Sequence, residues 1–432
     1  MIGGGCAGLA AATRLAEQGM SPTLFEASSQ LGGRARAVSW KGLQLDNGQH
    51  ILLGAYGETL CLLSLAGIKP GHSLLRLPLQ INVPGRFELI APKYLPAPLH
   101  ILAGLIRAKG LSLKERMAAL RFILWMRLNH FTLSADETLT SLLTRKAQPA
   151  NVIKLLWEPL CLAALNTPLD SASAQVFLNV LRDSFAQSSA DSDMLLPRHD
   201  LSTIIAEPLA AYILAQGGNI ALNAPISRLA RTSNGFEIET ADGKITQFDQ
   251  VIVATSPFRV AELLAELPEL KDIAALCTQF SYQPIYTIYL QYPENVELNA
   301  PMVGLTDSHG QWVFDRGRLC GQHGLLAVIV SAEGAHQKLT QEALAIAIRK
   351  ELSHVFPHLP EPLWHKVIAE KRATFACIAK LKRPRQETAL PGLYLAGDYT
   401  AGDYPATIEG AVRSGVQCAN LILSHTNTQV AK

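Results

Sequence analysis

The chain has little charge and lacks any long apolar run. Asp, Glu, Lys and Arg make up 17% of its 432 residues, whereas about 25% is usual for soluble domains. No run of about 18 apolar residues is present, so no transmembrane helix is predicted. No signal peptide is expected, because no basic segment precedes an apolar one near the N-terminus. The net charge of +2, without a Lys/Arg-rich run, argues against nucleic acid as a partner.

The seven cysteines are scattered, and none of them forms a C-x-x-C pair. This usage is typical of reduced, buried thiols in a cytoplasmic protein, and it predicts neither a disulfide framework nor a zinc site. His354 and His358 have the spacing of helical metal ligands, but Pro357 interrupts the helix that such ligands need. We therefore predict a cytoplasmic location and no metal site.

What the sequence does have is a glycine signature at its start, MIGGGCAG. Gly3, Gly5 and Gly8 occupy the glycine positions of G-x-G-x-x-G, separated by small residues. The first glycine permits a tight turn, the second lets a pyrophosphate approach the backbone, and the third lets helix and strand pack closely. A helix predicted over 9–18 would direct its N-terminus at the phosphates. The signature indicates a dinucleotide-binding βαβ unit.

An acidic residue follows the next predicted strand. Glu26 lies eighteen residues beyond Gly8, close to the spacing of about 20 expected for the residue that binds the ribose hydroxyls. Only Met1 and Ile2 precede the glycines, although strands of about 5 residues are normal. We therefore expect the first strand to begin upstream of this sequence.

Several later segments repeat this strand, turn and helix pattern. They are a Gly32-Gly33-Arg34 turn, an extended 43–54 segment that bends at Gly48-Gln49-His50, a β-meander within 202–243, a buried strand over 248–255, and a strand over 393–396 with a Gly397-Asp398 turn and a helix over 407–423. A cation and glycines in the first turn are suited to a pyrophosphate.

The order of these segments predicts an α/β fold with two discontinuous units. A Rossmann-like nucleotide-binding domain with a β-meander would comprise residues 1–85, 200–265 and 385–432. An α+β substrate-binding domain, made of 86–199 and 266–384, would interrupt it. The block before residue 200 is expected to be mostly helical and apolar.

Two helical stretches bear on the surroundings of the protein. Residues 99–106 are apolar and precede Arg107 and Lys109, and residues 114–128 place arginines around Trp125. A basic, tryptophan-bearing amphipathic helix is suited to a bilayer interface. The same pattern fits a core helix of the substrate domain, and the sequence leaves both interpretations open.

Taken together, these motifs resemble the flavin-dependent amine oxidase and phytoene desaturase superfamily, which implies FAD as the cofactor. The resemblance rests on GGGCAG, Glu26, GGRAR and the C-terminal LAGD. Ser28 stands where many members carry an arginine that contacts phosphate. Carried onto this chain, the resemblance implies that FAD contacts Gly3, Gly5, Cys6, Ala7, Gly8, Glu26, Ala27, Gly33, Arg34, Gly48, Gln49, His50, Ile226, Gly397, Asp398, Thr407, Ile408 and Ala411.

Within the superfamily the chain is similar to the hydroxysqualene dehydroxylase family, also called squalene-associated FAD-dependent desaturases. The similarity rests on LDNGQHILLG, WEPLCLAALNTP, QWVFDRG, EKRATFA and GDYPATIEGAVRSG. It implies reductive removal of an allylic hydroxyl in squalene and hopanoid biosynthesis, with hydride from reduced flavin. A hydrophobic isoprenoid substrate agrees with an apolar content of 48%, and its delivery would bring the protein to the inner face of the cytoplasmic membrane as a peripheral protein.

For catalysis we consider Glu158, a carboxyl group among apolar residues, as the proton donor. Arg372 is a candidate for orienting the substrate or for screening the charge of reduced flavin. Glu158 would equally serve as a salt-bridged carboxylate at a helix end. The electron donor is unknown, because no second glycine signature for a nicotinamide cofactor is visible. Three alternatives are a phytoene-type desaturase, an amine oxidase and a carrier without flavin chemistry. The amine oxidase is disfavoured, because Thr407 stands two positions before Glu409, where an aromatic ring is usual in that family.

Overall fold

A parallel sheet assembled from distant parts of the chain carries the glycine signature. The structure is a computed structural model and describes residues 1–430. Ile2 bridges to Phe25 on one side and to Val253 on the other. The sheet therefore runs, from edge to edge, β9 (Asn219–Ala221), β1 (Thr23–Phe25), Ile2, β13 (Val251–Val253) and β19 (Leu393–Leu395). Every pairing is parallel, as the predicted Rossmann-like arrangement requires.

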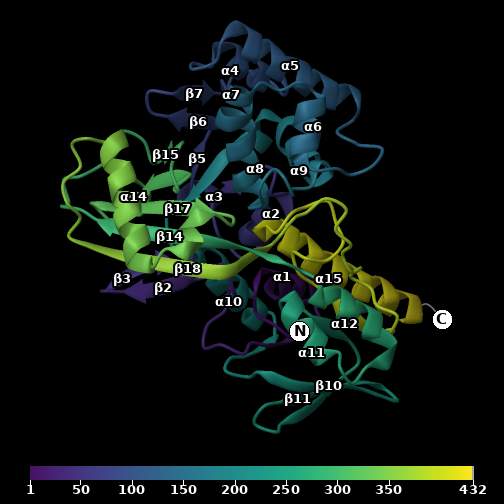
Figure 1. Ribbon diagram of the computed structural model, residues 1–432. Coiled ribbons are helices and arrows are strands. Elements are labelled where there is room, and N and C mark those ends of the chain that lie inside the picture. Colours follow the sequence, from purple (N-terminus) through teal and green to yellow (C-terminus); the bar gives the residue numbers. More distant parts are fainter. Residues whose placement is uncertain (431–432) are drawn as a thin grey trace.

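Helix α1 (Cys6–Glu17) begins inside the glycine signature, three residues before the predicted start at residue 9. It packs against α15 (Ile408–Val430) and α10 (Glu207–Ala215), with α2 (Gly57–Leu65) beside α15 (Figure 1). Gly415 permits the close approach of α1 and α15, because a Cβ there would lie 2.1 Å from the Ala7 carbonyl oxygen. Alanine-rich α1 is buried on nearly all sides, so this helix is the core of the nucleotide-binding region.

A meander is present beside this sheet, but its third strand lies beyond residue 243, where the prediction ended it. Strands β10 (Ile226–Thr232), β11 (Gly235–Thr240) and β12 (Ile245–Phe248) pair antiparallel in that order. The remaining elements around the nucleotide-binding sheet are β2 (Ala37–Trp40), β3 (Leu43–Asp46), β4 (Leu52–Leu53), α3 (Pro70–Ser73), β5 (Leu74–Leu77), α11 (Pro257–Leu263) and α12 (Lys271–Thr278).

A second sheet, antiparallel and five-stranded, forms one wall of the other unit. Its order is β15 (Met302–Gly304), β16 (Trp312–Asp315), β17 (Leu325–Ser331), β14 (Tyr282–Gln291) and β18 (Trp364–Phe375). Helix α14 (Gln341–Val355) covers one face, and α13 (Arg316–Cys320) follows β16 (Figure 1). The long strands β14 and β17 are neighbours inside this sheet.

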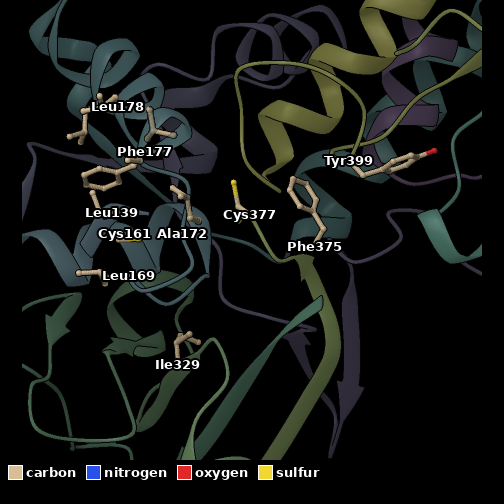
Figure 2. Close-up of a cluster of buried hydrophobic side chains, with 14 of the residues drawn as sticks. Leu139, Cys161, Leu169, Ala172, Phe177, Leu178, Ile329, Phe375, Cys377 and Tyr399 are labelled. Atoms are coloured by element: carbon tan, nitrogen blue, oxygen red, sulfur yellow. The ribbon is translucent and has the colours of Figure 1, made fainter. Parts of the chain in front are cut away.

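Helices dominate the block before residue 200, as predicted, although three strands accompany them. The helices are α4 (Leu99–Arg107), α5 (Leu113–Leu128), α6 (Leu139–Arg145), α7 (Ala150–Val152), α8 (Glu158–Leu165) and α9 (Ala174–Phe185); the strands are β6 (Gln80–Val83), β7 (Phe87–Ile90) and β8 (Met194–Pro197). A π-helical turn, Ile153–Trp157, joins α7 to α8. Figure 2 shows the core of this block, where Leu139, Cys161 and Phe177 gather beside the end of β18 at Phe375.

The predicted domain division stays a prediction, and one strand crosses it. β8 pairs with both β4 and β5, so residues 194–197 are hydrogen-bonded to the segment before residue 86. One hydrophobic cluster likewise runs from Ile2 and Phe25 through the helical block to Tyr399. The two units therefore share a core where the chain passes between them.

Candidate active site

Each glycine of the N-terminal signature has its own steric reason. Gly3 has φ of +110°, and a Cβ there would lie 2.6 Å from the Ala254 carbonyl oxygen. A Cβ on Gly8 would lie 2.0 Å from the Gly3 carbonyl oxygen, so Gly8 lets α1 start directly against the turn. A Cβ on Gly5 would meet no heavy atom of the described residues within 4 Å. Open space at Gly5 together with the amides that begin α1 fits a pyrophosphate.

The second glycine turn packs directly on the first. The Gly32 amide donates to the Gly4 carbonyl oxygen at 2.9 Å. A Cβ on Gly33 would lie 3.3 Å from the Gly5 Cα, and both Gly32 and Gly33 have positive φ. Only residues without side chains can bring these two backbones together. The two glycine turns lie apart in the sequence but pack against each other. Together they form one cradle of backbone atoms, which we call the glycine cradle.

Glu26 is fixed at the carboxyl end of β1 by backbone amides. Its Oε2 accepts a hydrogen bond from the Gly4 amide at 2.7 Å, and its Oε1 accepts one from the Ser28 amide at 2.9 Å. The side chain also lines the cavity beside this sheet, next to Ala27 and Ile226. An acceptor held at this place suits the ribose of a dinucleotide, as the sequence predicted.

Arg34 connects the GGRAR turn to the C-terminal LAGD motif. Its guanidinium donates to Asp398 Oδ2 at 2.8 Å and to the Ala373 carbonyl oxygen at 2.7 Å. Arg383 in turn donates to the Asp398 carbonyl oxygen at 2.6 Å. Arg34 thus joins the GGRAR turn to two segments that lie more than three hundred residues further along the chain.

The Gly48-Gln49-His50 bend is anchored by a buried ion pair. Asp46 and Arg316 are each 1% exposed, and Arg316 donates to Asp46 Oδ2 at 3.0 Å and to Gln49 Oε1 at 2.9 Å. The second Asp46 oxygen accepts from the Leu201 amide at 2.9 Å. LDNGQH and QWVFDRG, two of the phrases that carried the resemblance, therefore meet at this pair.

His50 is the imidazole that this bend presents to the cavity. Its Nδ1 lies 2.5 Å from the Gly48 carbonyl oxygen, and we assign the proton to Nδ1, so Nε2 remains available on the other side of the ring. Burial lowers the pKa of His50, and Arg34 lowers it further, while Asp46 opposes the shift. The neutral form of the ring is therefore favoured over the imidazolium.

A single cavity of about 830 Å³ runs from the glycine turns into the substrate unit. At one end it is lined by the backbone of the two glycine turns and by charged side chains. At the other end its walls are apolar and come from two neighbouring helices, α8 and α9, and from three strands of the second sheet. They include Leu160, Phe177, Leu181, Met302, Trp312, Phe314 and Ile329. The wall also includes Ala164 and Met194. Such a shape fits a dinucleotide cofactor joined to an elongated apolar ligand.

The structure brings the sequence-predicted cofactor residues together. All of them line the cavity except Gly8, whose place is structural, at the start of α1. Thr407, Ile408 and Ala411 line it from the beginning of α15, and Gly397 and Asp398 line it from the turn after β19. The departure at Ser28 leaves its amide in use as a donor to Glu26.

Glu158 and Arg372 are placed differently. Neither belongs to the described residues that line the cavity. Glu158 is exposed at the start of α8, although partial burial of its carboxyl raises the pKa in the expected direction. Arg372 is exposed on β18, and its guanidinium lies 4.4 Å from the centre of the Phe258 ring. The geometry does not bring these two side chains to a site where they would touch substrate.

Sequence reasoning missed several polar residues of the cavity wall. Asn47, Asn166, Glu370, Thr374 and Tyr404 all line it. Asn47 Nδ2 donates to Glu370 Oε2 at 3.3 Å, and Asn166 Nδ2 donates to Thr374 Oγ1 at 3.0 Å. A signal was available, because all five lie within the phrases that carried the resemblance.

The glycine cradle, the acceptor at Glu26 and the long cavity fit FAD and define a flavoprotein. The chain belongs to the family of flavin containing amine oxidoreductases, whose family model matches residues 6–423. It is an FAD-dependent oxidoreductase.

Relatives of known name sharpen this placement. Hydroxysqualene dehydroxylase from Sinorhizobium fredii is 28% identical over 99% of each chain. The enzyme of the same name from Zymomonas mobilis is 26% identical, again over 99% of each chain. A 15-cis-phytoene desaturase from an Oncidium hybrid is 26% identical over 98% of this chain and 77% of its own length.

Solved structures confirm the fold. An oxidoreductase from Methanosarcina mazei superposes with a TM-score of 0.76 at 20% identity, covering 97% of this chain and 99% of the other. Cyclohexylamine oxidase from Brevibacterium oxydans superposes with a TM-score of 0.72 at 16% identity, covering 99% and 98% of the two chains. At these identities the likeness shows the architecture alone.

Proposed function

We propose that this enzyme removes the hydroxyl group of hydroxysqualene reductively, giving squalene for the squalene and hopanoid pathway. The observation that carries the proposal is the continuity of the cavity from the glycine cradle to an apolar chamber. A polar substrate would leave the apolar walls without complementary groups, whereas an isoprenoid hydrocarbon chain would cover them. The full-length similarity to hydroxysqualene dehydroxylases supports the same substrate class.

The reaction needs one proton and one hydride. The proton goes to the hydroxyl oxygen, the C–O bond breaks, and water leaves. The remaining cation is allylic, so its charge is shared with the neighbouring double bond. FAD, when bound in its reduced form, supplies the hydride that this carbon takes up. The chain's own contribution is to bind the hydrocarbon, to exclude other nucleophiles and to deliver the proton.

We assign the proton to Nε2 of His50 rather than to Glu158. His50 lines the cavity beside the cofactor turn, its Nδ1 is engaged by Gly48, and burial lowers its pKa. Because the neutral ring carries its one proton on Nδ1, Nε2 first takes up a proton from solvent. The resulting imidazolium, which burial disfavours, then passes this proton to the hydroxyl oxygen as the C–O bond breaks. The apolar walls around Phe177 and Phe314 keep bulk water from the cation. Arg34 and Asp398 would hold the cofactor end.

The surroundings of the enzyme follow from its substrate. Among the residues described, no helix has the length and apolar character that crossing a bilayer requires. A thirty-carbon isoprenoid nevertheless resides in membranes, so we propose a cytoplasmic enzyme that meets its substrate at the inner face of the cytoplasmic membrane. The reductant that reloads the flavin would come from outside the chain.

A phytoene-type desaturase is the second candidate, favoured by similarity to 15-cis-phytoene desaturase over 98% of this chain. That reaction uses oxidised flavin and runs in the opposite redox direction. An amine oxidase is less well supported, because Thr407 lines the cavity two positions before Glu409 and supplies no aromatic ring there.

One anaerobic experiment separates these functions. The FAD-loaded protein is photoreduced, hydroxysqualene is added, and flavin absorbance and products are followed together. We expect reoxidation of flavin with an equal amount of squalene. A flavin that stays reduced would contradict the dehydroxylase, and conversion of phytoene by oxidised enzyme would establish the desaturase.

A further inference from the structure

Helix α5 turns an apolar stripe away from the protein. Its inner face is buried in the core through Ala118, Ala119, Phe122, Ile123 and Met126. Leu113, Met117, Leu124 and Leu128 lie along the opposite face, at spacings of four, seven and four residues. They are 74%, 48%, 57% and 71% exposed, respectively. An ordinary surface helix would carry polar residues here.

Helix α4 and the segment before it extend this stripe. Leu99 and Ile106 are 50% and 56% exposed, and Tyr94 is 72% exposed. Arg116 of α5 donates to the Ile106 carbonyl oxygen at 2.7 Å, which ties the two helices together. Both helices lie at the outer edge of the molecule, far from the meander (Figure 1). Residues 90–128 hold eight of the fourteen large apolar side chains that are exposed in the described structure.

The same segment is strongly basic. Residues 86–128 contain eight Lys or Arg and two Asp or Glu, a net charge of +6 from 8 − 2, whereas the whole chain has +2. Arg107, Lys114 and Arg121 are exposed beside the stripe and form no ion pair with any described residue. We call the exposed apolar residues of 94–128 and these three cations the basic apolar face.

The basic apolar face lies close to the apolar end of the cavity. Helix α4 packs on β7, and β7 pairs antiparallel with β6. Gln80 and Ile81 of β6 line the cavity. The two-stranded β6–β7 sheet therefore connects α4 to the wall of the chamber that would hold a hydrocarbon.

We propose that the basic apolar face docks on an anionic lipid bilayer and so brings the cavity to the membrane. The purpose of this docking, access to a membrane-borne substrate, rests on the proposed function. Aliphatic side chains flanked by unpaired cations match an acyl boundary beneath anionic headgroups. A protein partner would favour aromatic anchors and few lysines. Among the exposed apolar residues of the face, only Tyr94 is aromatic. The ring of Trp125 stacks on Phe122 and is covered by Lys146, 3.9 Å from its centre, so it is no outward anchor.

The test uses holoenzyme without substrate and two types of vesicle, phosphatidylcholine alone and phosphatidylcholine with phosphatidylglycerol. We expect flotation with the anionic vesicles, weakened by salt. The variant Lys114→Glu/Arg121→Glu is expected to lower partitioning by about tenfold or more, since each cation near such a surface contributes about a factor of five. Leu113→Ser/Leu124→Ser/Leu128→Ser is expected to lose binding to the anionic vesicles as well.

Matched controls carry the same changes elsewhere. Lys244→Glu/Lys271→Glu and Leu214→Ser/Ile245→Ser/Leu363→Ser alter exposed residues outside the face and should bind like the wild type. Flavin content and far-UV circular dichroism report folding in every variant. Failure of the wild type to bind, equal binding by face and control variants, or a dimer broken by the leucine variant would overturn the proposal. None of these outcomes depends on turnover, so they are separate from a failure of the proposed function.

Discussion

The two ends of the cavity are built in opposite ways. The cofactor end is lined by backbone at Gly3, Gly5 and Gly33, together with the fixed charges of Glu26 and Arg34. The other end is lined by apolar side chains from helices and strands that are distant in sequence. A backbone wall demands glycine at set positions, so it leaves a motif. An apolar wall demands only side chains of suitable volume, which are equally at home in a core.

A buried ion pair, Asp46–Arg316, connects the cofactor end of the cavity to the substrate end. Asp46 belongs to β3 on the cofactor side, and Arg316 begins α13 after a strand of the substrate sheet. The bend that carries His50 follows Asp46 directly. The position of His50, the proposed proton donor, and the attachment of the two units to each other therefore both depend on the buried Asp46–Arg316 ion pair.

Breaking that pair is expected to have the largest effect. Asp46→Ala leaves the Arg316 guanidinium buried without its carboxylate, which should lower the free energy of unfolding by about 3–5 kcal/mol. Chemical denaturation followed by circular dichroism measures this change. The matched control is Glu269→Ala, which removes the exposed ion pair with Arg231 and should cost under about 1 kcal/mol. Similar losses in both variants would show that the join is not held at Asp46.

Replacing the proposed proton donor should come next in size. His50→Gln is expected to lower dehydroxylation by about 10²-fold, with FAD content and substrate affinity retained. His358→Gln, at an exposed position, is the control. Single-turnover reoxidation of photoreduced flavin measures the chemical step.

The pH dependence sharpens the same assignment. Because burial lowers the pKa of His50, the protonated form accumulates only below the ordinary histidine range. The single-turnover rate should therefore rise as pH falls through and below about 6.5, and His50→Gln should flatten this dependence. Folded His50 binds fewer protons than unfolded His50 in this range, so its contribution to stability is lost as pH falls. A rate that declines with acidification would contradict the role of His50.

Two glycines of the cofactor turn should separate folding from binding. Gly8→Ala places a Cβ 2.0 Å from the Gly3 carbonyl oxygen and is expected to destabilise the protein by about 1–3 kcal/mol. Gly5→Ala meets no described atom, so the apoprotein should keep its stability while FAD affinity falls. Thermal unfolding of apoprotein and FAD titration give the two measurements. Equal stability losses would mean that Gly5 is structural too.

The sequence was sufficient for the cofactor end because each requirement there is local. Gly3, Gly5 and Gly8 are set by backbone approach within one turn, and Glu26 follows from the length of one βα unit. The meander and the buried strands were likewise predictable from alternation and β-branched runs. The helix start was placed late, at residue 9, because the helix opens within the glycine loop at Cys6.

The apolar end could not be predicted in the same way. Leu160, Phe177 and Ile329 come together only because β17 and two helices close on one space. Arg316 is buried against Asp46 across a sequence separation of 270 residues. The sequence does not reveal that Leu124 and Leu128 are exposed. Both faces of α5 are apolar, and only the packing of the folded chain decides which face is buried.

The smallest effect is expected where sequence and geometry diverge. Glu158 was the carboxyl that the sequence favoured, because apolar neighbours raise a carboxyl pKa. Partial burial of the carboxyl group does raise the pKa of Glu158. The residue as a whole is nevertheless exposed, and it does not line the cavity. Glu158→Gln and Arg372→Gln should therefore change the single-turnover rate by less than about twofold, since neither removes a group near the reacting carbon. A fall in the single-turnover rate of Glu158→Gln as large as that of His50→Gln would identify Glu158 as the proton donor. It would also mean that α8 moves when substrate binds.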